Sequence, residues 1–299
     1  KLSKNQLKKL KKKREWEEGR EARKAKRKEK IKGKKERKRE AKEQAIADGT
    51  YVEPTPKRIH GNIQVPITFI FDCDFEDLMH PSELISLASQ LTRAYSDNRN
   101  AKYSAHLAVS SFGGKMKERF DGILAGHYES WKNVKFYSED FVQVAEKSKA
   151  IMTSKNGGVI RGSLQRAKRD GGEGSSEAES ELIYLSSDSD YTLTELKPYT
   201  CYVIGGLVDR NRHKGICYKR AMDRDIKTAK LPIGEYMEMN SRSVLTTNHV
   251  SEIMLKWLEL GDWGDAFIQV IPKRKGGALK GKCENESSAE EDIQHSDNE

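Results

Sequence analysis

The feature that most constrains the fold is an alternation of short apolar runs with segments of helical spacing along most of the chain. Residues 65–75, VPITFIFDCDF, form a continuous apolar run that ends in acids. Similar strand patterns lie at residues 105–112, 134–138, 182–190, 201–208 and 228–233. Helical patterns separate and follow them, at residues 81–98, 115–124, 215–224 and 248–271. This alternation predicts an α/β fold with a mostly parallel sheet.

Charge is distributed unevenly along the 299 residues. Residues 1–45 hold 22 Lys and Arg against 8 Asp and Glu, a net charge of +14, whereas residues 284–299 hold seven acids and no Lys or Arg. Core-forming residues begin near Ile63, and Gly, Ser and charged residues interrupt the pattern at 153–181. We therefore predict a basic N-terminal arm and linker over residues 1–62, a folded domain over 63–275 with a mobile insertion at 153–181, and an acidic, disordered tail over 276–299.

The basic arm is built from good helix formers and has too few apolar residues to attach it to a core. We expect a long solvated helix or a disordered segment. RNA is the partner that fits such an arm, because each neutralised phosphate releases counterions and adds affinity without fixed geometry. A solubilising tail or a nuclear-import signal is the alternative.

Several kinds of protein and site are disfavoured by what the sequence lacks. It contains no run of 18 apolar residues that could span a membrane. Its four cysteines form no CxxC pair, and no signal-peptide-like stretch is present, which favours free thiols in a reducing compartment. The GxGxxG, P-loop and HExxH motifs are absent, and His213 and His249 lie far from any cysteine pair of metal-binding spacing. We therefore expect no metal site.

The segment at residues 202–215, YVIGGLVDRNRHKG, departs from the pattern of a buried strand. Two glycines interrupt its apolar run, and six polar residues then follow in a row. Glycine in a strand marks a bulge or a close approach to the backbone, and ligands of open α/β sheets bind at the carboxyl ends of the strands. The segment is therefore predicted to be either a ligand-binding loop or a bare turn before the next helix.

This segment, with LPIGEYM at 231–237 and VLTTNHVSEIMLKW at 244–257, closely resembles the tRNA (guanine-9-N1)-methyltransferase family of the SPOUT superfamily. DCDFEDLM at 72–79 and SQLTRAYSDNR at 89–99 are similar to the same family, and so is KKKREWEE in the basic arm. The resemblance covers most of residues 8–275, with its blocks in the right order. The insertion and the acidic tail have no counterpart in it.

The resemblance implies a SPOUT-type fold with a C-terminal trefoil knot, in which S-adenosylmethionine binds bent and is held mostly by backbone groups. On this basis the two glycines would let the main chain approach the cofactor without a Cβ in the way. Cys217 would be a small packing residue and not a nucleophile. The cofactor-binding residues that the resemblance implies are Leu185, Gly205, Asp209, Arg210, Asn211, Arg212, His213, Cys217, Leu231, Ser243, Val244, Leu245 and Thr246.

The reaction that the resemblance implies is methyl transfer to N1 of guanine 9 in tRNA, with the nucleotide extruded into the pocket. Guanine N1 carries a proton that must leave. Asp209, the only acid in the polar run, is the expected catalytic residue, either as the proton acceptor or as the group that orients N1–H. The alternative is that Asp209 caps the helix that follows.

RNA contacts are expected from the basic arm and from cations of the folded domain. Arg210 and Arg212 would grip phosphates beside the target base. The other candidates, each also compatible with a solvated surface charge, are Arg93, Arg99, Lys102, Lys115, Lys117 and Arg119.

Two alternative functions stay open. One is a non-catalytic tRNA-binding or assembly protein that keeps the pocket, and the intact Asp209 favours the enzyme over it. The other is an enzyme of the same fold that methylates adenine at position 9, which residue identity does not separate from the guanine enzyme. We expect a monomer, although most SPOUT enzymes dimerise through the knot, and we expect it in the nucleus and cytoplasm.

Overall fold

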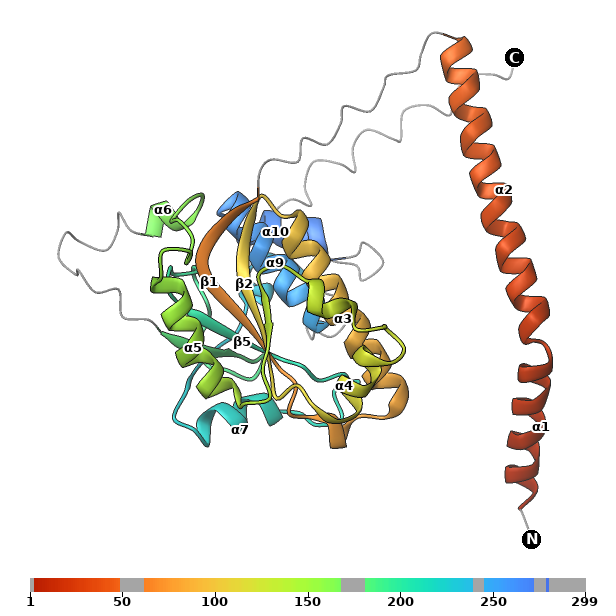
Figure 1. Cartoon of the computed structure of the whole chain (residues 1–299), viewed down its shortest axis with the longest axis horizontal. Coiled ribbons are helices and arrows are strands. Elements are labelled where there is room, and N and C mark those ends of the chain that lie inside the picture. The colour runs from red at the N-terminus through yellow and green to blue at the C-terminus, as the bar shows by residue number, and fades with distance from the viewer. Residues whose placement is uncertain (1–2, 49–61, 168–180, 239–244, 272–277, 280–299) are drawn as a thin grey trace, which may run out of the picture. The chain divides into compact units, whose positions relative to one another are not determined.

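The computed structural model describes residues 3–48, 62–167, 181–238, 245–271 and 278–279, and the chain divides into two compact units, Lys1–Arg58 and Ile59–Glu299. The first unit holds two helices, α1 (Lys4–Glu18) and α2 (Arg20–Ala47) (Figure 1). Ser3 starts α1 by accepting a hydrogen bond from the Gln6 backbone N–H. Among the side chains that the structure describes in these helices, the large apolar residues Leu7, Leu10, Ile31 and Ile46 are exposed, at 54%, 51%, 53% and 54%. The arm is therefore helical over its described residues without a core of its own.

The second unit is built on a six-stranded parallel sheet in the order β3-β2-β1-β5-β4-β6. The strands are β1 (Ile63–Asp72), β2 (Tyr103–Ser110), β3 (Val134–Phe136), β4 (Leu182–Leu185), β5 (Cys201–Gly205) and β6 (Lys227–Ala229). A two-stranded antiparallel sheet joins β7 (Met237–Glu238) to β8 (Ala278–Leu279). The predicted parallel α/β fold is confirmed, whereas the trefoil knot stays a prediction.

Helices cover both faces of the sheet (Figure 1). They are α3 (Pro81–Asn100), α4 (Gly114–Asp121), α5 (Phe141–Thr153), α6 (Leu164–Ala167), α7 (Ile216–Met222), α8 (Ile233–Tyr236), α9 (Thr247–Leu260) and α10 (Trp263–Val270), with 3-10 turns at Glu76–Leu78 and His127–Ser130. The central position of β1 in the sheet explains why its residues 65–72 are all buried and mostly apolar. Val65, Ile67, Phe69 and Phe71 belong to the core with α3 and α9, whereas Ile70 packs with α5 and α7 on the other face.

Three segments differ from the predicted elements. The strand predicted at 182–190 ends at Leu185. The hydroxyls of Ser186 and Ser189 each accept the backbone N–H of the residue two positions later, and these local hydrogen bonds turn the chain. Helix α5 was not predicted from the sequence. Residues 154–167 of the predicted insertion belong to the folded unit, where Leu164 is fully buried, and residues 168–180 lie outside the described residues.

Candidate active site

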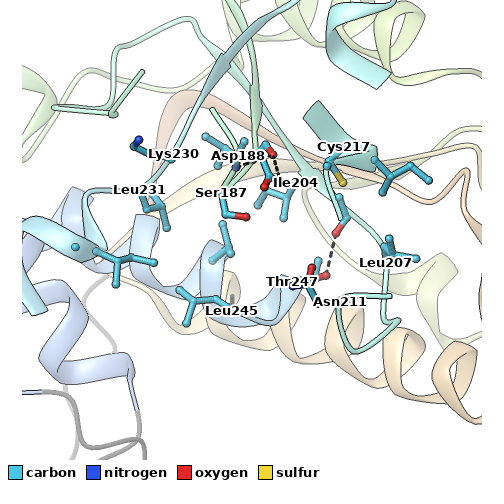
Figure 2. Close-up of a pocket in the computed structure, with 18 of the residues that line it drawn as sticks. Ser187, Asp188, Ile204, Leu207, Asn211, Cys217, Lys230, Leu231, Leu245 and Thr247 are labelled. Atoms are coloured by element: carbon cyan, nitrogen blue, oxygen red, sulfur yellow. Dashed lines mark hydrogen bonds between the residues drawn. The ribbon is translucent and has the colours of Figure 1, made fainter. Parts of the chain in front are cut away.

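A cavity of about 430 Å³ lies at the carboxyl ends of β4 and β5 (Figure 2). Four regions form its walls: the turn after β4, the loop between β5 and α7, the segment between β6 and α8, and the start of α9. Apolar side chains such as Ile204, Leu231 and Leu245 line it together with the polar side chains of Asp188 and Asn211. Its volume falls in the range of about 300–1,000 Å³ that is typical of small-molecule sites.

The structure gathers most of the residues that were predicted for the cofactor. Those that line the cavity are Leu185, Gly205, Asp209, Asn211, His213, Cys217, Leu231 and Leu245. Arg210, Arg212 and Thr246 do not line it, and Ser243 and Val244 lie outside the described residues. In the loop after β5, residues 209, 211 and 213 therefore face the cavity, whereas residues 210 and 212 do not.

Several lining residues were not predicted. Ser187 and Asp188 follow β4 directly, and the strand predicted through residue 190 hid the turn that places them there. Lys230 follows β6 in the same way. Thr247, at the start of α9, lines the cavity and donates a hydrogen bond from Oγ1 to the Gly205 carbonyl at 3.0 Å. The rule that ligands bind at the carboxyl ends of parallel strands was the available signal for the first three.

Asp209 is only 7% exposed, and its carboxylate organises the loop that follows it. Oδ1 accepts the Asn211 backbone N–H and Oδ2 accepts the His213 backbone N–H, both at 2.7 Å. Each carboxylate oxygen has a second lone pair, so the group can also accept a hydrogen bond from a ligand. Asp209 therefore holds the loop and lines the cavity, but it does not cap α7, whose N-cap is Gly215 without a side-chain hydrogen bond.

The two glycines of the motif are required by contacts inside the protein. A Cβ on Gly205 would lie 2.6 Å from Cys217 Sγ, and one on Gly206 would lie 2.7 Å from the Asp72 carbonyl oxygen. Gly206 does not line the cavity. Close packing against α7 and β1 thus explains both glycines, whereas the approach of the cofactor to the backbone of Gly205, which lines the cavity, stays a prediction.

A buried ionic network lies beneath Gly205. The Asp72 side chain is fully buried, accepts a hydrogen bond from the Tyr184 hydroxyl at 2.9 Å, and pairs with Arg220 Nε at 2.6 Å. Burial raises the pKa of Asp72, and the Arg220 charge opposes that shift. Burial also raises the pKa of the Cys217 thiol to about 11, so this thiol is protonated at neutral pH and is not an activated nucleophile.

Comparison with known proteins identifies the family. Residues 1–276 match the family model tRNA (guanine(9)-N(1))-methyltransferase TRM10/TRM10A. The chain belongs to this family. A tRNA (guanine(9)-N1)-methyltransferase of Aspergillus fumigatus is 54% identical over 290 residues, which are 93% of this chain and 71% of that protein. The Schizosaccharomyces pombe enzyme of the same description is 38% identical over 285 residues, 93% of this chain and 81% of that protein.

A solved structure supports the same assignment. The crystal structure of full-length spTrm10 in complex with SAH is 37% identical, with a TM-score of 0.57 over 71% of this chain and 99% of that one. The resemblance to the TRM10 family seen in the sequence is thus confirmed. Among the described residues, no helix is long and apolar enough to cross a membrane, and no group of His, Cys, Asp and Glu side chains could hold a metal ion.

Besides Arg210 and Arg212 in the loop after β5, the cations predicted to contact RNA fall at three places on this TRM10 family member. Arg93 and Arg119 line a groove of about 400 Å³ between α3 and the α4 region, where Arg119 Nε has no hydrogen-bond partner among the described residues. Arg99 and Lys102 lie at the end of α3 and the turn to β2. On α4, Lys115 pairs with Glu76 and Lys117 pairs with Asp121. Arg93 and Arg119 therefore line a concave surface, whereas the two lysines of α4 already have acidic partners.

Proposed function

We propose that this protein transfers the methyl group of S-adenosylmethionine to N1 of guanine 9 in tRNA. The observation that carries the proposal is the family match over residues 1–276, with the residues that the family motif implies gathered around one cavity at the carboxyl ends of β4 and β5. The Aspergillus fumigatus and Schizosaccharomyces pombe relatives carry the same enzyme description. The SAH complex of spTrm10 supports the choice of cofactor.

The cavity suits this cofactor chemically. An adenine ring needs apolar walls, which Ile204, Leu231 and Leu245 provide, and ribose hydroxyls need polar partners such as Asp188. Asn211, which lines the cavity from the loop after β5, would meet the methionine part. When bound, S-adenosylmethionine supplies a methyl group on a positively charged sulfur. The protein's own contribution is to bind both substrates and to hold guanine N1 in position.

Asp209 is the residue that we assign to guanine N1. Two backbone N–H groups fix its carboxylate at the cavity wall, and its remaining lone pairs can accept the N1–H proton or orient it by a hydrogen bond. The target nucleotide must leave the tRNA stack to reach this group. Arg93 and Arg119 in the α3 groove, and the cations of the basic arm, would bind phosphates without reading the sequence.

Asp209→Asn tests this assignment. The amide has the same shape but a single acceptor oxygen, so it loses one of the two backbone hydrogen bonds as well as acceptor capacity toward N1–H. We therefore expect methyl transfer to fall by about tenfold or more, the least that losing a hydrogen bond to a charged group costs. Single-turnover transfer at several pH values measures the effect, and Asp223→Asn, an exposed acid at the end of α7, is the matched control. Wild-type rates at every pH would remove Asp209 from the mechanism.

The function itself is tested with tRNA transcripts that carry G or A at position 9, followed by nucleoside analysis. We expect 1-methylguanosine from the G9 transcript, and methylation of the A9 transcript would extend the specificity to adenine. Thermal unfolding with S-adenosylmethionine is the binding assay, because a ligand specific to the folded state raises the melting temperature. Binding of tRNA without methyl transfer would identify a non-catalytic protein.

We also propose that the protein acts as a monomer, located in the nucleus and cytoplasm. Sedimentation should give a mass near the 34.0 kDa of one chain. A mass of two chains would contradict the monomer, and imaging of the tagged full-length chain tests the location.

A further inference from the structure

The loop that carries Asp209 is tied to a distant helix by one side chain. The Arg212 guanidinium forms a forked pair with Glu83 on α3, with N–O distances of 2.6 and 2.7 Å. It also donates to the Leu78 carbonyl at 3.0 Å. Such a bidentate pair fixes direction as well as distance. Arg212 thus faces α3, whereas its neighbours Asn211 and His213 face the cavity.

Glu83 is a firm anchor for this pair. It lies in the first turn of α3, where its Oε2 accepts the His80 backbone N–H at 2.8 Å and starts the helix. Its side chain is only 10% exposed. Hydrogen bonds from Arg212 lower the pKa of Glu83 to about 2, so the carboxylate is charged throughout the pH range of an enzyme assay.

The loop needs an anchor because its backbone conformation is energetically unfavourable. Arg210 and Asn211 both adopt the left-handed conformation, at φ 54° and 63°, which is unfavourable for L-residues in general, although Asn adopts it more readily than Arg. The hydrogen bonds that hold this shape converge on Asp209, which also accepts the Arg212 backbone N–H through its carbonyl at 3.2 Å. Position and orientation of the Asp209 carboxylate therefore depend on where Arg212 is held.

We propose that Glu83 and Arg212 are positioning residues that hold the 209–213 loop, and with it Asp209, in the geometry for methyl transfer. This inference rests on the proposed function. It replaces the phosphate-binding role predicted for Arg212, whose fork is already occupied by a carboxylate. Neither side chain needs to touch the guanine or the cofactor.

The test uses full-length Glu83→Gln, Arg212→Lys and the double variant. Gln is accepted at the third position of a capping box, so Glu83→Gln removes the charge and keeps the start of α3. Lys keeps a charge that could bind a phosphate but cannot form the fork. Glu181→Gln is the matched control, because Glu181 also pairs with cations, Lys197 and Lys227, outside the cavity.

Hydrogen exchange of the peptide that contains residues 209–214 is measured first, without ligand. We expect both single variants to exchange about tenfold faster or more, because charge-assisted hydrogen bonds contribute at least that factor. Glu181→Gln should match the wild type. In methyl transfer, kcat should fall about 10- to 100-fold, as misplacement by ~1 Å can do, with the dissociation constant for tRNA unchanged. The double variant should be no worse than either single one.

Unchanged exchange in Glu83→Gln would overturn the proposal. So would a pattern in which Arg212→Lys weakens tRNA binding while Glu83→Gln keeps the wild-type kcat, because Arg212 would then bind RNA. The exchange measurement tests whether the Glu83–Arg212 pair holds the loop even if the wild-type protein transfers no methyl group. Failure of the proposed function and failure of this inference are therefore distinguishable.

Discussion

The contact between Gly205 and Cys217 leads to a specific prediction about Gly205→Ala. The new methyl carbon would lie 2.6 Å from Cys217 Sγ but 4.0 Å from Cys217 Cβ. Carbon atoms pack favourably at about 3.5–4.0 Å, so the sulfur atom alone causes the clash. Relief requires a movement of about 1 Å by the thiol or by the end of β5. Such overpacking costs about 1–3 kcal/mol of folding free energy.

Removing the sulfur should rescue the variant. In Gly205→Ala/Cys217→Ala the two methyl groups would be 4.0 Å apart, an ordinary contact, and the added carbon partly fills the space that the sulfur leaves. Cys217→Ala alone should cost at most about 1 kcal/mol, because Cys217 is only partly buried. We therefore expect the double variant to be about as stable as Cys217→Ala and more stable than Gly205→Ala.

Urea unfolding of the wild type, both single variants and the double variant measures this coupling, and binding of S-adenosylmethionine is measured in parallel. A double variant with restored stability but weak cofactor binding would mean that the cofactor also requires a bare backbone at Gly205, as the resemblance implied. A double variant less stable than Gly205→Ala would refute the packing explanation.

Three further predictions follow from other parts of the structure. Gly206→Ala should cost ~3 kcal/mol of folding free energy, the upper range for overpacking, because its Cβ would meet the Asp72 carbonyl oxygen. Rescue by Cys73→Ala in urea unfolding would contradict this explanation, because the clash would then be with the Cys73 side chain and not with the backbone. Arg220→Met leaves the buried Asp72 carboxyl unpaired and should cost up to about 3–5 kcal/mol. The pKa of Asp72 is already raised in the wild type and would rise further without Arg220. Ionising the Asp72 carboxyl as the pH increases would therefore lower the free energy of unfolding of the variant. The loss of stability in Arg220→Met should therefore be larger near pH ~8 than near pH ~5, and a pH-independent loss would argue against the role of Asp72 ionisation. Deleting residues 1–45 should flatten the plot of log tRNA affinity against log salt, and equal slopes would show that the arm neutralises no phosphates.

The sequence alone predicted the fold class and several of the residues that line the cavity. The central strand β1 is buried on both faces, so most of its residues are apolar, and that pattern is visible in the strand's own sequence. Helix α9 shows the same kind of local information, with Ile253, Met254 and Trp257 on one buried face. Helix α5 has a comparable apolar face in Phe141, Val144 and Ala145 and could have been found by the same rule.

Tertiary structure decided which residues meet. The strand order places β1 beside β5, so the buried Asp72 lies opposite Gly205, and the turn after β4 joins the start of α9 in one cavity. The partner of Arg212 is Glu83, 129 residues earlier in the chain. Sequence pattern reports the local period of burial, whereas a side chain's contacts depend on long-range packing. For this reason the motif at residues 202–215 predicted which loop forms the cavity, whereas only the folded chain shows what each residue of that loop contacts.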